Sequence, residues 1–415
     1  MTSPVLERFL RYVAYDTQAR EDSTTYPSTP GQLVLLRDLV TELQAMGIVD
    51  ATMDEHGYVM ATIPATTTRA NVPVIGVIAH VDTSPEMSGA GVKPIVHRAY
   101  DGRDLVLPDD PEAVLRVADM PYLGECLGHD LVTASGTTLL GADNKSGVAA
   151  IMTAAAYLMA HPEIPHGAIR IGFTPDEEIG KGTTHFDVTR FGARYAYTMD
   201  GGPRGELEYE SFSADAISLT FRGLNTHPGY GKGRMVNAIK LAARFIDRLP
   251  SDRLSPETTS GREGFVHPNV VQAAVDRTTV KLLVRDFDTA ALKEKEAWLR
   301  ALAEGVVAEV PGAAVDVHVD EQYRNMREVL DEHPLVVERA REAITRTGLT
   351  VRERAIRGGT DGSRLSFMGL PTPNIFAGEQ NFHSRFEWVS VQDMEKAVDV
   401  IVELAKVWED RTGSA

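Results

Sequence analysis

Two histidines and several carboxylates follow apolar runs in this chain, and such residues together can bind divalent metal ions. The residues that close successive runs are His80, Asp82, Asp143, Glu177, Glu178, Asp200 and His383. Three acids lie side by side at 176–178, and such like charges repel unless something positive lies near them. Imidazole nitrogens combined with carboxylate oxygens favour zinc as that positive partner.

Strand-like and helix-like segments alternate through the first half of the chain. Residues 72–80 are a short run rich in Val and Ile, typical of a strand buried on both faces. Residues 147–160 form an Ala-rich run, which predicts a buried helix. The alternation predicts an α/β domain with a mostly parallel central sheet. Because ligands bind beyond the carboxyl ends of parallel strands, the acids and histidines should converge at one sheet edge.

Each of these short motifs is weak when taken alone. The sequence HVD at 80–82 is usually a turn, and DEE at 176–178 is usually a solvated loop. The prediction of a metal site therefore depends on their joint occurrence at successive strand ends.

The pattern changes after residue 203. Residues 205–223 alternate polar and apolar side chains, which predicts a half-exposed antiparallel strand. Helix-like stretches follow, so the segment 209–326 is expected to form an inserted α+β domain. The first domain would then comprise residues 1–208 and 327–415, interrupted by this insertion.

Composition excludes several classes of function. The chain has 415 residues and a formal net charge of −17, which disfavours nucleic acid and anionic membrane as partners. Its single cysteine, Cys126, forms no intrachain disulfide. The first residues predict an amphipathic helix rather than a signal peptide, and no run is long enough to span a bilayer. A cytoplasmic monomer or homodimer is the expectation.

Long motifs in matching order make the sequence similar to metallopeptidases of the M20 clan. They include ERFLRYVAYDTQ, HVDTSPE, TLLGADNKSG, IPHGAIRIGFTPDEEIGKGTTHFD, AYTMDGG, HPGYGKGRMVNAI, RGGTDGSRLSFMGLPTPN and NFHSRFE. Within that clan the resemblance is to the members that remove the N-terminal residue from tripeptides. It implies a zinc-peptidase-like domain with an inserted lid domain and two zinc ions per subunit.

The resemblance also implies a role for each candidate residue. One zinc would be bound by His80 and Asp200, the other by Glu178 and His383, and Asp143 would bridge the two. Asp82 would orient the imidazole of His80. Glu177 would be the general base for a water held between the metals. A cis peptide at Asp143–Asn144 is also expected from the resemblance.

Four residues of the inserted domain and its return segment are candidates for substrate contacts. By resemblance, His227 would donate a hydrogen bond to the oxyanion, and Arg357 would bind the carboxylate of the substrate. Asn237 and Arg285 are further lid candidates. By residue type alone, His227 could be a turn histidine, Arg357 a surface arginine, and Asn237 a solvated helix residue. Arg285 could pair with a neighbouring aspartate.

The sequence departs from the clan pattern at a few positions beside the expected site. Asn144 replaces an aspartate, and Glu379, Gln380 and Ser384 replace glycines and a tyrosine. Two alternatives remain open at this point. One is a different M20 hydrolase, such as a dipeptidase, carboxypeptidase or N-acyl amino acid hydrolase. The other is a peptide-binding protein on an inactive hydrolase scaffold, against which the presence of Glu177 and all five ligand candidates argues.

Overall fold

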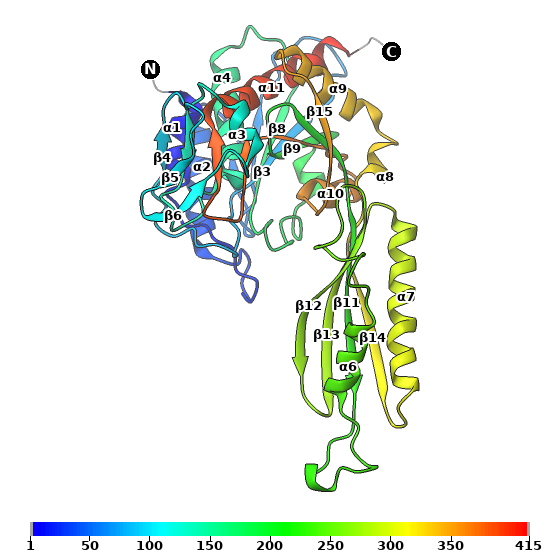
Figure 1. The fold of residues 1–415 in the computed structure, drawn as a ribbon. Helices are drawn as coiled ribbons and strands as arrows, with labels where there is room; N and C mark the ends of the chain where they lie inside the picture. Colours follow the sequence, from blue (N-terminus) through cyan, green and yellow to red (C-terminus); the bar gives the residue numbers. More distant parts are fainter. Residues whose placement is uncertain (1–2, 413–415) are drawn as a thin grey trace. The chain divides into compact units, whose positions relative to one another are not determined.

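A computed structural model describes residues 3–412, which divide into two compact units (Figure 1). Unit 1 comprises residues up to Tyr209, Val329–Arg354 and the residues from Thr360 onward, and unit 2 comprises Glu210–Glu328 and Ala355–Gly359. The boundaries expected from the sequence place 355–359 in the first domain, whereas the structure packs this short segment in unit 2.

The centre of unit 1 is a mixed sheet. Its strands, in spatial order, are β1 (Thr52–Met53), β2 (Val59–Ile63), β8 (Ile169–Thr174), β3 (Ile75–His80), β9 (Tyr195–Gly201), β16 (Asn374–Phe376), β10 (Glu206–Ser211) and β15 (Arg352–Ile356). Parallel pairing joins β8, β3, β9 and β16, while β1, β2 and β10 pair antiparallel with their neighbours. The expected parallel arrangement therefore holds for the four central strands only.

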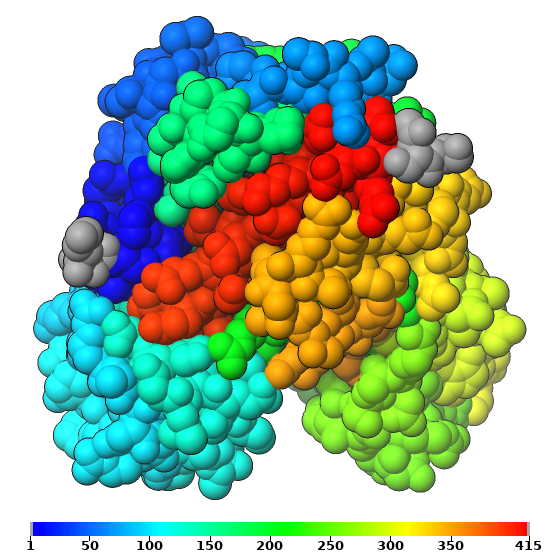
Figure 2. Space-filling view, turned by 90° about the horizontal axis from the view of Figure 1, so that it is seen from above, coloured from blue at the N-terminus to red at the C-terminus, as the bar shows by residue number. Residues whose placement is uncertain are grey.

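Helices cover this sheet and complete the core of unit 1. They are α1 (Pro4–Tyr12), α2 (Pro30–Ala45), α4 (Ala142–Ala160), α5 (Val188–Phe191), α9 (Pro334–Arg346), α10 (Asp361–Phe367) and α11 (Val391–Asp410). Helix α4 contacts β3 and β9 as well as α1 and α11, and it is buried over most of its length, as its Ala-rich sequence predicts. Figure 2 shows α9 and α11 side by side on one face of unit 1.

Two small sheets and two short helices complete unit 1. The antiparallel sheet β17–β18–β7–β4 consists of Glu379–Gln380, Trp388–Ser390, Leu131–Thr133 and Ile95–His97. The hairpin pairs β5 (Leu105–Leu107) with β6 (Asp110–Leu115), α3 spans Pro121–Glu125, and α8 (Arg327–Leu330) spans the return from unit 2. Trp388 is fully buried in a cluster with Leu131 and Leu123, which fixes the C-terminal segment onto this part of the unit.

Unit 2 is an antiparallel sheet with two helices. The strand order is β12 (Phe265–Ala273), β13 (Arg277–Asp286), β11 (Ser213–Arg222) and β14 (Ala314–Tyr323). Helices α6 (Ala238–Asp247) and α7 (Thr289–Ala308) lie against this sheet (Figure 1). Their apolar side chains belong to the core of the unit, and η1 is a short turn at Pro228–Tyr230.

The segment 205–223 differs from its expected single strand. It forms two strands, β10 and β11, which belong to two different sheets. The break falls at Phe212, whose ring is fully buried against Phe265 and Phe287. Strict alternation predicted the strands but not the interruption, because Phe212 packs against side chains from distant parts of the sequence. Among residues 3–412, no helix combines the length and apolar character needed to cross a membrane.

Candidate metal centre

Three neighbouring parallel strands bring the predicted residues to one edge of the central sheet. His80 is the last residue of β3, Asp200 lies next to the end of β9, and Glu177 and Glu178 follow the end of β8. Strand β3 lies between β8 and β9 and is parallel to both. The carboxyl ends of the three strands therefore coincide, which is where ligands bind in open α/β sheets.

The first group of side chains contains His80, Asp143 and Asp200. The Nε2 atom of His80 lies 2.9 Å from Oδ1 of Asp143 and 3.2 Å from Oδ1 of Asp200. The side chain of His80 is only 2% exposed, so this group lies at the inner end of the site.

The second group contains His383, Glu178 and Asp143. The Nε2 atom of His383 lies 2.7 Å from Oε2 of Glu178 and 3.2 Å from Oδ2 of Asp143. Its side chain is 31% exposed, so this group is the more accessible one. Asp143 thus offers one oxygen to each group, and it is the residue that joins them.

The backbone at the start of α4 holds Asp143 in place. Asp143 and Asn144 have non-helical dihedral angles, and the peptide bond between them is cis, as the resemblance implied. Gly141 precedes them with φ of 83°, a left-handed conformation that favours glycine. Gly147 is needed for another reason, because a Cβ there would lie 2.0 Å from the carbonyl oxygen of Met199 on β9.

Glu387 is a buried carboxylate that fixes the same loop. Its Oε2 atom accepts hydrogen bonds from the backbone N–H groups of Leu140 and Gly141 at 2.6 and 2.8 Å, and its Oε1 atom accepts one from Asp143 at 3.0 Å. Burial raises the pKa of Glu387 to about 7, and these N–H donors oppose that shift. Glu387 therefore positions Asp143 through the backbone.

The adjacent acids of the triplet have separate environments. Asp176 accepts hydrogen bonds from Ser28 N–H at 2.6 Å and from Gln32 Nε2 at 2.7 Å, so it ties the loop after β8 to the start of α2. Asp82 accepts bonds from the backbone N–H groups of Glu177 and Glu178 at 3.0 and 3.1 Å. His80 Nδ1 lies 3.3 Å from Asp82 Oδ1 and 3.2 Å from the carbonyl oxygen of Asp82, so Asp82 contacts both the imidazole and the acidic loop.

The electrostatics of the site show a need for positive charge. Burial and the charge of Asp143 raise the pKa of Glu178 to about 8, and burial with neighbouring carboxylates raises the pKa of Glu177. Burial opposes the charging of His383, but its hydrogen bonds to Asp143 and Glu178 raise its pKa to about 11. The carboxylates therefore favour a positive charge at the imidazole of His383, and a divalent cation bound here would supply positive charge in the same place.

The donor set fits divalent metal ions. Ligand atoms of His80, Asp143 and Glu178 lie within 4.8 Å of one another, as do those of Asp143, Asp200 and Glu379. The side chain of Glu178 is only 4% exposed, and its Oε1 atom has no hydrogen-bond partner. A buried carboxylate oxygen is costly without a partner, and a metal ion would provide one.

Three acidic residues at the site were not assigned a role from the sequence. They are Asp361, Glu379 and Glu387, and all three are buried. Glu379 follows the apolar run of β16, so the strand-end rule that found His383 could also have found Glu379. Glu387 is flanked by Phe386 and Trp388, and an acid within such an apolar stretch was the available signal.

Arg285 and Arg357, both predicted to contact substrate, lie together in unit 2. The Nη1 atom of Arg285 donates to the carbonyl oxygen of Arg357 at 3.3 Å, and both guanidinium groups lie over the ring of Phe265. Arg357 also donates to the carbonyl oxygens of Gly261 and Glu263 at 2.7 and 2.9 Å. The structure therefore gives these two arginines a shared aromatic support.

The other two candidates of unit 2 lie elsewhere in that unit. Asn237 caps α6, because its Oδ1 atom accepts from the N–H groups of Ile239 and Lys240 at 2.9 and 3.3 Å. His227 precedes the short turn η1 and accepts from Gly229 N–H at 3.2 Å. Both side chains have a local structural role within unit 2.

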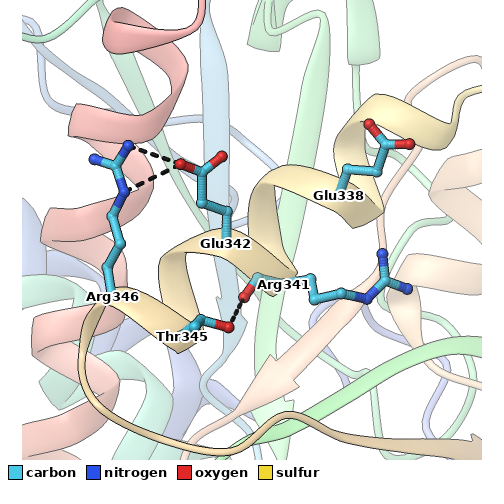
Figure 3. A pocket seen from close by; sticks show the side chains of 5 residues that line it. All are labelled: Glu338, Arg341, Glu342, Thr345 and Arg346. Atoms are coloured by element: carbon cyan, nitrogen blue, oxygen red, sulfur yellow. Dashed lines mark hydrogen bonds and ion pairs between the residues drawn. The ribbon is translucent and has the colours of Figure 1, made fainter.

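A separate shallow pocket lies on α9 (Figure 3). The side chains that line it are Glu338, Arg341, Glu342, Thr345 and Arg346. Arg346 pairs with Glu342 at 2.7 Å, and Thr345 donates to the carbonyl oxygen of Arg341 at 2.8 Å. None of the predicted site residues lines this pocket. The candidate functional site is therefore the cluster formed by His80, Asp143, Glu178, Asp200 and His383.

Comparison with known proteins identifies the class to which this fold and site belong. Residues 139–407 match the model of peptidase family M20/M25/M40. A relative from Geobacillus thermodenitrificans is 49% identical over 99% of this chain and 100% of its own length. The chain therefore belongs to peptidase family M20, and it is an enzyme of the peptidase class.

The relatives carry a more particular name. The Geobacillus protein is named Peptidase T, and so is a Bacillus subtilis protein that is 49% identical over 99% of both chains. Among solved structures, the aminopeptidase PepT from Bacillus cereus has a TM-score of 0.75 at 23% identity, covering 98% of both chains. The dinuclear metal-binding M20 peptidase YXEP from Bacillus subtilis has a TM-score of 0.66 at 17% identity, covering 97% of both chains. These structures confirm the predicted α/β fold class.

Proposed function

We propose that this chain is a metal-dependent aminopeptidase that releases the N-terminal residue from tripeptides. The full-length relatives named Peptidase T support this reading. The observation that carries it is the position of Asp143, whose two carboxylate oxygens lie within 3.2 Å of two different imidazoles. Such a shared carboxylate suits a pair of metal ions.

The proposed ligands divide into two sets around Asp143. His80 and Asp200 would hold one ion, and Glu178 and His383 would hold the other, with zinc expected at both positions. When bound, a pair of such ions supplies Lewis acidity for the peptide carbonyl and lowers the pKa of a water. Asp82 would orient His80 from behind through its Nδ1 atom.

Glu177 is the proposed general base. Its backbone is fixed by Asp82, and its carboxylate is buried near Glu178 and Asp200, which raises its pKa. A carboxylate of raised pKa accepts the proton of the attacking water more readily, and it can then donate that proton to the leaving amine.

The residues of unit 2 are proposed to contact the substrate. A planar guanidinium suits a free peptide carboxylate, so Arg357, supported by Arg285, would set the accepted peptide length. His227 would donate a hydrogen bond to the reacting carbonyl oxygen, and Asn237 would line the peptide. A role in the cytoplasm is part of this proposal.

The first experiment compares wild type with Glu177→Gln, which keeps the shape of the side chain but removes the base. We expect wild type to release the N-terminal residue of a free tripeptide. The variant should keep its metal content and lose at least about a hundredfold in kcat. Glu163→Gln, which alters an exposed glutamate, is the matched control.

Substrate variants test the specificity. Dipeptides, tetrapeptides and N-acetylated or C-amidated tripeptides should all be poorer substrates than the free tripeptide. A wild-type enzyme that binds two metals but prefers N-acyl amino acids would contradict the aminopeptidase reading. Equal turnover of amidated and free tripeptides would remove the proposed role of Arg357.

A further inference from the structure

Glu379 is a buried carboxylate that lies outside the five-residue ligand set. It is the first residue of β17, pairs in register with Val389 of β18, and is 2% exposed. It stands four residues before His383, so the same short segment carries both side chains.

The surroundings of Glu379 are acidic. Its carboxylate oxygen lies within 4.8 Å of ligand oxygens of both Asp143 and Asp200. Its one hydrogen bond from a side chain, a 3.3 Å contact from Ser146 Oγ, is long. Among residues 3–412, no ion pair neutralises Glu379. It adds a third carboxylate to the position where Asp143 and Asp200 already lie close together.

Two carboxylates held close together cannot both stay ionised cheaply, and a third adds to that cost. An ionised carboxylate with a purely structural role would need an arginine, a lysine or several N–H donors, such as those that Glu387 has nearby. Ser146 provides one weak donor only. A divalent cation placed among the three oxygens would satisfy them together.

We propose that Glu379 is an additional metal ligand at the position formed by Asp143 and Asp200. This inference rests on the metal-dependent function proposed above. With His80 on the same side, this position offers one nitrogen and three carboxylates. The position formed by His383, Glu178 and Asp143 offers one nitrogen and two carboxylates.

The difference in ligands has a consequence for metal selectivity. With His80, Asp143, Asp200 and Glu379 as ligands, the water held between the two ions would be a fifth donor. Five donors, most of them oxygen atoms, exceed the four that zinc usually takes and are closer to the octahedral coordination of Mn²⁺. Glu379 therefore shifts this one position towards manganese relative to zinc. The two metal positions would therefore differ in their preference for Mn²⁺ over Zn²⁺, and Glu379 is the residue that causes this difference.

The test measures metal binding directly, apart from activity. Chelator-stripped wild type, Glu379→Gln and Glu379→Asp are titrated with Mn²⁺ alone, followed by the electron paramagnetic resonance signal of free Mn²⁺. Separate titrations use Zn²⁺ against a competing chromophoric chelator. Loss of an indirect partner of a metal ligand costs about 10–100-fold in affinity, so loss of a direct ligand should cost at least about tenfold.

We expect Glu379→Gln to lose at least about tenfold in Mn²⁺ affinity at one of two sites, and less for Zn²⁺. Glu379→Asp, which keeps the charge, should retain the preference for Mn²⁺, and Glu163→Gln should match wild type. Circular dichroism of the stripped proteins shows whether each variant folds.

Two other outcomes would overturn this inference in distinguishable ways. If Glu379→Gln binds both ions like wild type but shows a higher KM for peptides with a free amine, Glu379 contacts the substrate and not a metal. If stripped wild type binds neither ion, the metal-dependent function itself fails together with this inference.

Discussion

Asp176, Glu177 and Glu178 are chemically similar neighbours, yet the fold gives each a different partner. Asp176 has φ of 58° and turns back to the segment that begins α2, where Ser28 and Gln32 bind it. Glu178 contacts His383, whereas burial and the charges of Asp361 and Asp200 raise the pKa of Glu177. Because the chain turns sharply after β8, the three carboxylates point in different directions. Each has its own surroundings, which limits the repulsion between them.

Metal affinity should rise with pH, because protons and metal ions compete for the same atoms. The pKa of His383 is raised to about 11 and that of Glu178 to about 8 in the chain without metal, so at neutral pH at least one proton must leave when metal binds. Release of one proton tightens binding about tenfold per pH unit. Calorimetric titrations between pH 6 and 8, in buffers of different ionisation enthalpy, measure both quantities. A pH-independent affinity with no proton release would contradict this account.

Sequence patterns predicted the side chains that lie together at the candidate metal centre. They did not predict the residues that hold those side chains in place, such as Glu387. His80, Glu178 and Asp200 were found because each lies at or just after the end of a strand of the central sheet, and the ends of parallel strands converge. The strand-end expectation was wrong for Asp143 and His383, because Asp143 lies in the first turn of α4 and His383 in the loop between β17 and β18. Glu387 acts through the backbone N–H groups of a loop far away in the sequence. No local pattern encodes that pairing, since it depends on how β18 is placed beside β7.

At the scale of elements, the segment from β17 to β18 does most to complete the centre. Within it, Glu379 approaches Asp143 and Asp200, His383 contacts Glu178, and Glu387 holds the loop before α4. The small sheet β17–β18–β7–β4 anchors this segment, and Trp388, the residue after Glu387, is buried in the core beneath it. That sheet was not anticipated, because its strands are two to three residues long and carry little periodicity.

Glu387→Gln should weaken both the fold and the metal centre. An amide group has one acceptor oxygen, so at least one of the three buried N–H groups would lose its partner, at a cost of about 1–3 kcal/mol in the free energy of unfolding. Metal affinity should fall by about tenfold or more as Asp143 loses its support. Denaturant unfolding and metal titration measure the two effects.

A buried glutamate elsewhere in unit 1 provides the control for this change. Glu409 accepts from Thr67 at 2.7 Å and pairs with Arg69 at 3.2 Å, so Glu409→Gln should also cost stability. It should leave metal affinity unchanged. If both variants lowered metal affinity equally, general destabilisation rather than the position of Asp143 would explain the effect of Glu387.

At the scale of the whole molecule, the two units have separate hydrophobic cores. The core of unit 2 forms around β11, β13, α6 and α7, and it contains none of the proposed metal ligands. Its apolar pattern of alternating strands and amphipathic helices is local, which is why its α+β character could be predicted. The inclusion of Ala355–Gly359 in unit 2 could not, since that short segment returns to it from distant sequence.

Metal removal should destabilise unit 1 and leave unit 2 unchanged. An ion present at about a hundredfold above its Kd stabilises the unit that binds it by about 2.7 kcal/mol. Calorimetry with metal and with chelator should therefore shift one unfolding transition to lower temperature and not the other. Phe245→Ala, which opens a cavity in the core of unit 2, identifies the second transition. Equal shifts of both transitions would contradict independent unfolding of the units.

The order in which the chain is synthesised limits when the metal centre can form. His80, Asp143, Glu178 and Asp200 are made before unit 2, whereas Glu379, His383 and Glu387 are made after the whole of unit 2. Until that last segment folds onto β7, the loop before α4 lacks its carboxylate support and the second imidazole is missing. A chain synthesised only as far as unit 2 would therefore hold an incomplete acidic cluster. The proposed metal centre would become complete only once the segment 379–387 has been made and has folded onto unit 1.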